Sequence, residues 1–213
     1  MKKKKLNYTK SALITEIKNY NDQMKWDSYY NEESGYSHTA EPHPLEEAGE
    51  AYLDEKGFIL EAVKIDGYSL KYASERLKNN RTIVKQAIKN FPHWGFEFSS
   101  NNLKKDKKLV LWCISNKYEI NFWDIDKTLW DDKSLIYKYI KTFNFSPFHS
   151  GVYYYKNELE HDKKLINRLP SCFKDKNFIK KLIKIKDKSN NFAFKKAYRL
   201  MSQKNPKRDK WPR

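Results

Sequence analysis

Glycine, proline and cysteine are all scarce in this 213-residue sequence, and each shortage argues against a class of structure. The 6 glycines and 7 prolines are few for an all-β protein, which needs many tight turns. The 2 cysteines, Cys113 and Cys172, stand where an apolar residue is expected. We therefore interpret them as reduced core thiols and not as a disulfide or a metal-binding pair.

Long apolar runs are also missing. No segment approaches the ~20 consecutive apolar residues that a membrane-spanning helix needs. The basic start, MKKKK, is not followed by the apolar core of a secretory signal, because Glu16 and Lys18 interrupt it. We therefore expect a soluble protein that is located in the cytoplasm and has no membrane span.

Arginine is the scarce basic residue, although the formal charge of the chain is +16. Lysine outnumbers arginine by 37 to 6, whereas proteins that read nucleic acids favour arginine for bidentate contacts. Residues 1–50 carry a net charge of −2 and residues 151–213 a net charge of +13. Two interpretations of the basic C-terminal third stay open: a phosphate-binding function, or the lysine-rich composition expected of an AT-rich genome.

What the sequence does contain is a spacing of 26 residues between short polar residues. Asn80, Asp106 and Asp132 follow one another at this interval, and apolar residues come three, four and seven positions after each. Asp and Asn are preferred helix N-caps, and this apolar spacing forms one stripe of a helix. We place an earlier copy on Asp54, a later one on Asp162 after an insertion of four residues, and a truncated last copy on Asp175.

Apolar residues also recur ten, seven and three positions before these anchors, as in Leu70, Ala73 and Leu77. Each unit is therefore predicted to be a helix, a turn centred on Asp or Asn, and a second helix. Neither helix can bury its stripe alone, so neighbouring units must stack. The predicted fold is all-α: tandem two-helix repeats of about 26 residues in a short α-solenoid-like array. A chance self-match of a Lys-, Asp- and Leu-rich sequence is the alternative.

The flanks of the array complete the predicted organisation. Thr9 is predicted to cap a helix from Ser11 to about Trp26, and Asp27–Pro44 to be a polar loop. A basic amphipathic helix is predicted at Lys174–Lys188. The four predicted parts are an N-terminal helix and loop (1–44), the repeat array (45–170), basic C-terminal helices that cap it (171–203) and a disordered tail (204–213).

The clearest unit is DGYSLKYASERLKNNRTIVKQAI, from Asp66 to Ile88. Its pattern resembles a helical-repeat family known only as a domain of unknown function, number 4116 in its series, and the resemblance extends over Asp54–Lys117. In the next copy Ser99 and Ser100 replace the Ala-Ser pair. The resemblance implies a helical-repeat fold and brings no activity, cofactor or catalytic residue. The residues that carry it are Gly67, Leu70, Tyr72, Ala73, Ser74, Leu77, Asn80, Val84 and Ala87.

One motif suggests catalysis. Asp124-Ile-Asp126-Lys-Thr128 resembles the phosphate-transferring motif of haloacid-dehalogenase-like hydrolases, in which the first Asp is the nucleophile and magnesium lies between the two. That motif must end a buried parallel strand, and the sequence that follows is typical of helices. We therefore prefer a structural interpretation, in which Leu129 belongs to the apolar frame of the repeat.

Other candidate chemistry is weak. His38 and His43, with Glu41, can bind a metal adventitiously, but we interpret them as part of a solvated loop. Ser74 and Ser100 have no visible histidine partner, so a nucleophilic role is unsupported. The plentiful aromatic residues can stack bases, but their helical spacing favours a core role. We therefore predict no catalytic residue, no metal and no cofactor.

Our leading hypothesis is a non-catalytic binding or scaffold protein that recognises another protein through its stacked helices. The alternative is a nucleic-acid-associated protein, and an enzyme is the third class. For the basic helix itself, contact with phosphates, contact with anionic lipid and a soluble cap of the array all stay open. The predicted phosphate-facing residues of the alternative are Lys180, Lys181, Lys184, Lys195, Lys196 and Arg199.

Overall fold

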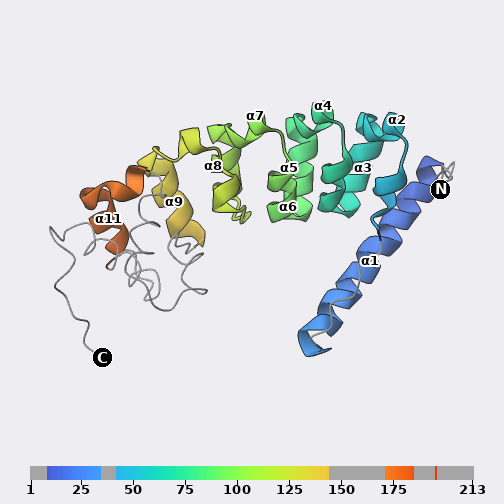
Figure 1. Ribbon diagram of the computed structural model, residues 1–213, viewed down its shortest axis with the longest axis horizontal. Helices are drawn as coiled ribbons and strands as arrows, with labels where there is room; N and C mark the ends of the chain where they lie inside the picture. The colour runs from blue at the N-terminus through green and yellow to red at the C-terminus, as the bar shows by residue number, and fades with distance from the viewer. Residues whose placement is uncertain (1–8, 35–41, 144–170, 185–194, 196–213) are drawn as a thin grey trace, which may run out of the picture. The chain divides into compact units, whose positions relative to one another are not determined.

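The computed structural model describes residues 9–34, 42–143, 171–184 and 195, and within these ranges it contains helices and no strands (Figure 1). The predicted all-α class is therefore confirmed. The chain divides into two compact units. Met1–Leu109 and Tyr118–Asp124 form the first unit, and Val110–Lys117 and Ile125–Arg213 form the second.

Most helices are short. The first unit contains α1 (Lys10–Ser34), the 3-10 helix η1 (Pro44–Glu47), α2 (Glu50–Leu53), α3 (Lys56–Ile65), η2 (Gly67–Tyr72), α4 (Glu75–Lys78), α5 (Arg81–Asn90), α6 (Pro92–Glu97), α7 (Asn101–Lys104) and η3 (Phe122–Asp124). The second unit contains η4 (Lys127–Leu129), α9 (Lys133–Phe143), η5 (Ser171–Lys174) and α11 (Lys176–Ile183). Helix α8 (Lys107–Ser115) begins in the first unit and ends in the second.

The first helix starts where the sequence predicts and ends later. The Thr9 hydroxyl accepts a hydrogen bond from the Ala12 amide at 3.2 Å, so the predicted cap is confirmed. The predicted end at Trp26 is wrong, because α1 continues to Ser34. The residues after Trp26 are polar, but they include no glycine or proline before Gly35, and polarity alone does not end a helix.

The predicted N-caps of the longer helices are confirmed in the part of the chain that the structure describes. Asn80 Oδ1 accepts from the amides of Thr82 and Ile83 at 3.1 and 3.3 Å. Asp106, Asp132 and Asp175 accept backbone N–H groups in the same way. The predicted anchor Asp162 lies outside the described residues.

Asp54 does not have the role that the sequence predicts. The N-cap residue of α3 is Glu55, and the Asp54 carboxylate instead accepts hydrogen bonds from Ser74 and Arg76. The reason is the interval: α3 begins 25 residues before α5, not 26. The hydrogen bonds from Ser74 and then Arg76 hold the pKa of Asp54 below its ordinary value.

The single helix predicted before each anchor is two short helices. After η2 the chain is extended at Ala73 and Ser74, and Ser74 Oγ accepts from the Leu77 amide at 3.3 Å to start α4. Ser100 starts α7 in the same way, through the Leu103 amide at 3.3 Å. Serine competes for backbone hydrogen bonds and favours such N-caps, so it interrupts an apolar pattern that reads as one helix.

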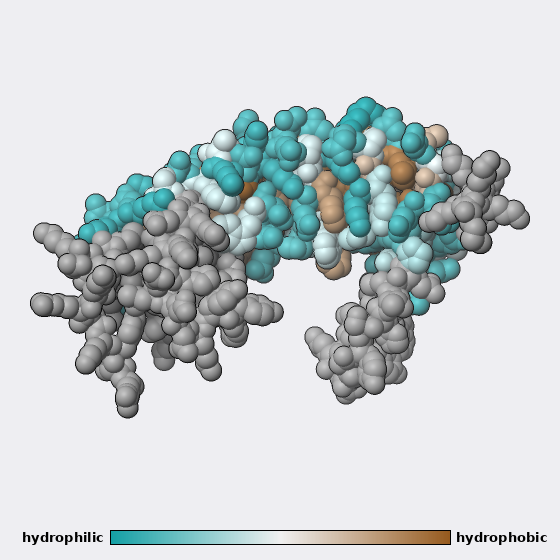
Figure 2. All heavy atoms as spheres, in the orientation of Figure 1, coloured by the Kyte–Doolittle hydropathy of each residue, from teal (hydrophilic) through white to brown (hydrophobic). Residues whose placement is uncertain are grey.

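Helix α5 lies at the centre of the first unit, where it packs against α3, η2 and α6 (Figure 1). Gly95 of α6 makes the closest approach: a Cβ built on it would lie 2.5 Å from the Ile88 nitrogen. On the face of the molecule in Figure 2, hydrophilic side chains cover most of the described surface, and hydrophobic side chains show in patches between them. The buried residues of α3 and α5 are Phe58, Ile59, Ala62, Val63, Ile83, Val84, Ala87 and Ile88.

Both cysteines are free thiols in the core, as predicted. Burial raises the pKa of Cys172 to about 12, so this thiol stays protonated and unreactive at neutral pH. Over the described ranges, no helix has both the length and the apolar character needed to cross a membrane.

Candidate functional site

A row of six rings in mutual contact runs across the first unit, and we call it the aromatic strip. Successive ring centroids lie between 4.7 and 6.1 Å apart, within the range of favourable aromatic pairs. Apart from His43, each ring belongs to a residue that is neither fully buried nor fully exposed. The strip consists of Tyr20, His43, Tyr72, Tyr68, Trp94 and Phe98.

The helices determine the order of the rings. Tyr68 and Tyr72 are four residues apart, within η2 and at its end. Trp94 on α6 and Phe98, the residue directly after α6, have the same separation. Trp94 and Phe98 stack with an interplanar angle of 7°. Tyr68 meets both at nearly right angles, with centroids 5.3 and 5.2 Å away. Stacked and edge-to-face pairs hold the rings in place, so this surface is preformed.

The strip already holds one cation. Lys71 Nζ lies 5.0 Å from the centroid of Tyr68 and 5.5 Å from that of Tyr72, within cation–π range. It also donates a hydrogen bond to the Tyr68 hydroxyl at 2.7 Å. That hydrogen bond raises the pKa of Lys71. The surface therefore stabilises an ammonium group.

His43 contradicts the prediction of a solvated loop, because its residue is only 3% exposed. Its ring stacks on Tyr72 at 4.7 Å and meets Tyr20 edge-on at 5.0 Å. His43 Nε2 lies 3.1 Å from Asp66 Oδ2, and Asp66 Oδ1 accepts from the Tyr68 amide at 3.0 Å. Local sequence could not predict the burial of His43, because α1 and η2, which cover it, are distant in sequence.

The group formed by His43, Asp66 and Ser69 resembles a hydrolytic triad but cannot act as one. His43 Nδ1 accepts from the Leu45 amide at 3.1 Å, so it carries no proton. We therefore assign the proton to Nε2, which donates to Asp66. Ser69 Oγ is 3.5 Å from the same Nε2, so no lone pair is available to remove a proton from the serine. The three residues fix the local structure.

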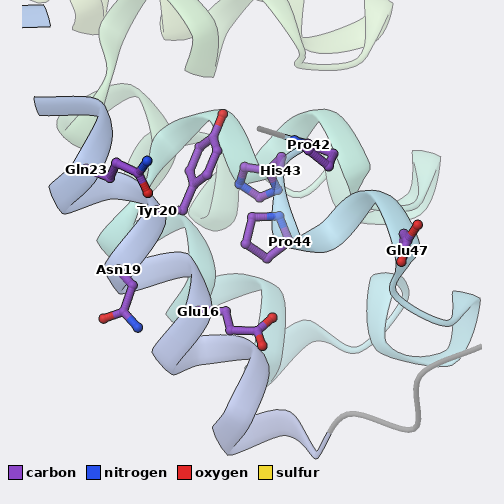
Figure 3. Close-up of a pocket in the computed structure, with 8 residues that line it drawn as sticks. All are labelled: Glu16, Asn19, Tyr20, Gln23, Pro42, His43, Pro44 and Glu47. Carbon is purple, nitrogen blue, oxygen red and sulfur yellow. The ribbon is translucent and has the colours of Figure 1, made fainter. Parts of the chain in front are cut away.

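A cavity of about 300 Å³ opens between α1 and η1, at the Tyr20 end of the strip (Figure 3). Figure 3 shows Tyr20 standing beside His43, with Glu16 extending from α1 towards Pro44. Among the residues that the structure describes, no Lys or Arg lines this cavity. Its lining residues are Glu16, Asn19, Tyr20, Gln23, Pro42, His43, Pro44 and Glu47.

Acidic residues are frequent in the segment beside this cavity, although the chain as a whole is basic. Residues 42–55 contain five acidic residues and no Lys or Arg, but Asp54 pairs with Arg76 and Glu55 pairs with Lys10. The pKa of Tyr20 is raised, first by burial and next by the negative charge of Asp66. Burial likewise raises the pKa of Tyr72, and Glu46 is one of the charges that add to the effect.

The lysines predicted to face phosphates lie on the second unit. Lys180, Lys181 and Lys184 are exposed at α11, beside the buried stripe of Phe178, Ile179 and Leu182 that the sequence predicts in part. Lys181 Nζ lies 4.6 Å from the centroid of the Tyr137 ring. Lys195 is also exposed, and Lys196 and Arg199 lie outside the described residues.

Asp124 does not have the strand context that the hydrolase motif requires. Asp124 belongs to the 3-10 helix η3 and ends no strand. Burial raises the pKa of its carboxyl group, which favours the neutral form, whereas a nucleophile must be ionised. Asp126 instead caps η4, where its Oδ1 accepts from the Thr128 amide at 2.9 Å. Among the residues that the structure describes, no cluster of His, Cys, Asp or Glu is suited to a metal ion.

The aromatic strip is the feature that the sequence prediction missed, because it assigned the aromatic residues to the core. No curated protein and no solved structure matches the chain. A family model does match, over a segment that contains α3 to α6 and four of the six strip residues. Residues 56–98 are similar to the family described as a domain of unknown function (DUF4116), as the sequence pattern predicted.

Proposed function

We propose that the chain is a non-catalytic binding protein, built as a tandem array of helical units, that recognises a polypeptide segment through the aromatic strip. The observation that carries the proposal is the strip itself: rings from α1, η2 and α6 and the His43 ring form one preformed, half-exposed surface. Tyr and Trp are the residues that most often anchor protein interfaces.

Recurrent positions in the first unit support the proposed array. Leu45, Leu70, Phe96 and Phe122 are all completely buried, at intervals of 25, 26 and 26 residues. Each belongs to one of the short helices η1, η2, α6 and η3. In a stacked array, residues at equivalent positions lie next to one another. Two pairs of strip residues are equivalent in this register: Tyr68 with Trp94, and Tyr72 with Phe98.

Repeated hydrogen bonds support a rigid array. The Ser74 amide donates to the Leu53 carbonyl at 2.9 Å, and its hydroxyl donates to Asp54. The Ser100 amide donates to the Lys78 carbonyl at 3.0 Å, and its hydroxyl donates to Asn79 at 2.6 Å. Each serine therefore fixes one proposed unit to the preceding one. A surface held in this way loses little conformational entropy when a partner binds.

The local charge favours a polypeptide over a nucleic acid at the strip. Asp54 and Glu55 pair with Arg76 and Lys10, but the other three acidic residues within 42–55 disfavour phosphates, and Glu16 adds a further carboxylate on α1. Nucleic-acid binding of the alternative kind would instead use the second unit. There, lysines are exposed along α11. Three carboxylates of that unit are engaged by backbone N–H groups at helix N-termini: Asp126, Asp132 and Asp175. We keep this as the second candidate function.

A random-peptide display selection on the purified full chain tests the leading proposal. We expect peptides whose dissociation constants rise at least tenfold for Trp94→Ala and for Tyr72→Ala. The matched control is Trp123→Ala, which removes an exposed aromatic side chain outside the strip and should leave binding unchanged. Circular dichroism and thermal melting verify that each variant is folded. A selection that yields no peptide, or only peptides that bind the strip variants equally well, would refute the proposal.

A further inference from the structure

We infer that α9 and α11 together form one phosphate-binding face, through which the second unit holds the backbone of a nucleic acid irrespective of its bases. This inference rests on the second candidate function and adds a contact surface on α9 that the sequence did not predict. It is independent of the aromatic strip, which belongs to the first unit. Four exposed lysines form the face: Lys138 and Lys141 on α9, and Lys181 and Lys184 at α11.

Almost all of the net charge of the chain belongs to the second unit. That unit has 24 Lys and Arg against 9 acidic residues, a net charge of +15, whereas the first unit has 19 against 18, a net charge of +1. Lysine alone is common in both units, with 20 in the second and 17 in the first. An AT-rich genome therefore does not account for the separation, which favours a polyanionic partner for the second unit.

Helices α9 and α11 carry their lysines at the same positions. On both helices, the residues six and nine positions after the N-cap Asp are exposed lysines, and the residues three, four and seven positions after it are buried. A step of three residues keeps side chains on one side of a helix, so each helix has a basic stripe beside its apolar one. At the two lysine positions α5 has Gln86 and Lys89, and α8 has Trp112 and Ser115. The lysine pair therefore distinguishes α9 and α11 from α5 and α8.

Side-chain contacts join the two helices, which are neighbours in Figure 1. Lys133, the first residue of α9, forms an ion pair with Asp175, the N-cap of α11. Further along, Lys181 Nζ lies 4.6 Å from the centroid of the Tyr137 ring. Tyr137 lies five positions after its cap and Lys181 six, so equivalent levels of the two helices meet. The two basic stripes therefore form one face.

The acidic residues next to α9 and α11 in sequence lie at one end of these helices. Neither helix contains Asp or Glu within its bounds. Asp131, Asp132 and Asp175 precede the helices, and each accepts a hydrogen bond. The four lysines come six and nine residues after the caps, about 9 and 14 Å along a helix with a rise of 1.5 Å per residue. Salt screens charges over about 8–10 Å, so these carboxylates cancel little of the attraction of the lysines for phosphates.

The burial of the apolar stripes favours a nucleic acid over a membrane surface. A helix that lies in a lipid interface inserts exposed apolar side chains between the lipids. The apolar stripes of α9 and α11 are instead buried within the protein. Among the residues that the structure describes, the large hydrophobic side chains that are exposed, Phe91 and Trp123, belong to the first unit.

The residue types of the face indicate contact with the backbone and not with base edges. Helices α9 and α11 contain six lysines and no arginine. Arginine reads a guanine through two fixed hydrogen bonds, whereas the lysine ammonium group acts as a point charge that a phosphate can approach from any direction. The half-exposed Tyr137 ring among these lysines adds a surface on which any base can stack. An acidic polypeptide would use the charges but not the ring.

The test measures the fluorescence anisotropy of a fluorescein-labelled strand of 20 thymidines with the full chain at 50–200 mM salt. The critical variant combines Lys138→Glu and Lys141→Glu. We expect its dissociation constant at 100 mM salt to rise at least tenfold, and the slope of log affinity against log salt to fall by about 1.4, at about 0.7 per lost phosphate contact. The control combines Lys127→Glu and Lys174→Glu, an equal change of charge at exposed positions outside α9 and α11, and should raise the dissociation constant less than threefold. Circular dichroism verifies that both variants are folded.

Three further probes test the kind of partner. A strand of 20 nucleotides of mixed sequence should bind within threefold of the thymidine strand, and a preference above tenfold would refute contact through the backbone. A polyglutamate of 20 residues should bind at least tenfold more weakly, and equal binding would show attraction to any polyanion. Vesicles of equal parts phosphatidylcholine and phosphatidylserine, supplied at the same phosphate concentration, should not displace the strand. Displacement would assign the face to a lipid surface and refute the inference.

The outcomes separate the proposals. If the native chain binds the strand and the variant with glutamate at both α9 positions binds it equally well, α9 takes no part and the inference is refuted, while the second candidate function stands. If the native chain does not bind the strand at 50 mM salt, the second candidate function fails as well. Neither result bears on the aromatic strip, because peptides selected on the strip should bind this α9 variant as tightly as the native chain.

Discussion

Replacing Gly95 with alanine tests the packing on which the strip depends. Gly95 follows Trp94 on α6, and its backbone lies against α5. An added Cβ would lie 2.5 Å from the Ile88 nitrogen and 2.6 Å from the Ala87 carbonyl carbon. Non-bonded carbon atoms prefer separations of about 3.5–4.0 Å, so the two helices would have to separate by about 1 Å.

The magnitude follows from two opposing terms. Inserting a methyl group into a well-packed core costs about 1–3 kcal/mol, and here the neighbours are backbone atoms that cannot rotate away. Alanine in place of glycine within a helix stabilises the protein by roughly 0.5–1 kcal/mol, because it lowers the conformational entropy of the unfolded chain. We expect Gly95→Ala to lower the free energy of unfolding by about 1–2 kcal/mol, and the melting temperature by about 2–8 °C.

Gly57→Ala is the matched control on the neighbouring helix α3. Gly57 is exposed, and the nearest atom to an added Cβ is Glu55 Oε1 at 4.0 Å. The same substitution should therefore raise the free energy of unfolding by up to about 1 kcal/mol. Urea titration followed by circular dichroism and by tryptophan fluorescence measures both variants. If Gly95→Ala is as stable as the native protein, the backbones of α5 and α6 do not meet at Gly95.

Three further variants test the caps, the buried carboxyl group and the basic helix. Ser100→Ala removes the α7 cap and the hydrogen bond to Asn79, and should lower the free energy of unfolding by about 1 kcal/mol. Ser115→Ala, at an exposed position at the end of α8, is its control. Equal free energies of unfolding for the two variants would contradict the capping role of Ser100. Asp124→Asn should stabilise the protein at pH 7, because burial raises the pKa of this carboxyl group and the folded state therefore binds its proton more readily than the unfolded state. The native protein loses this contribution as pH rises above 3.8 through the folded pKa, so the advantage of the variant should shrink towards pH 4 in urea titrations, and a constant advantage would contradict this origin. If the second unit binds a 20-nucleotide single strand, charge reversal of Lys180, Lys181 and Lys184 should reduce the slope of log affinity against log salt by about 2, and no binding by the native chain at 50 mM salt would refute that candidate.

The helix N-caps were readable from the sequence because they are local. Asn80 and Asp106 each precede an apolar stripe, and the hydrogen bonds they accept come from amides two and three residues later. These capping hydrogen bonds need no distant residue, so residue type and spacing suffice to predict them. The same holds for Thr9 at the start of α1.

The errors arose where two local patterns compete. The apolar spacing of Leu70, Ala73 and Leu77 is the same for one helix and for two short ones that bury the same side. Only the conformation of Ser74 distinguishes them, and serine can be either a helical residue or an N-cap. A fixed 26-residue register likewise placed Asp54 at a helix start, although the interval between α3 and α5 is one residue shorter.

The aromatic strip was harder to predict than the helices, because its role depends on whether its rings are exposed. The sequence contains the signal: Tyr68 and Trp94, and Tyr72 and Phe98, are 26 residues apart. Helical spacing shows which residues share a face, but not whether a neighbouring helix covers that face. His43 shows the opposite case, because its burial requires Tyr20, Asp66 and Tyr72, which local periodicity cannot connect to it.

The proposed register also bears on the partner. Counting 25 residues back from Tyr68 and Tyr72 gives His43 and Glu47, and counting 26 forward from Phe98 gives Asp124. If the units stack as we propose, the four positions equivalent to Tyr72 read Glu, Tyr, Phe and Asp, so an aromatic centre has a carboxylate at each end. At Glu47 the carboxylate borders an open cavity, and at Asp124 burial favours the protonated form. A bound segment would therefore meet apolar rings along Tyr68, Trp94 and Phe98, with a polar residue at each end of that series.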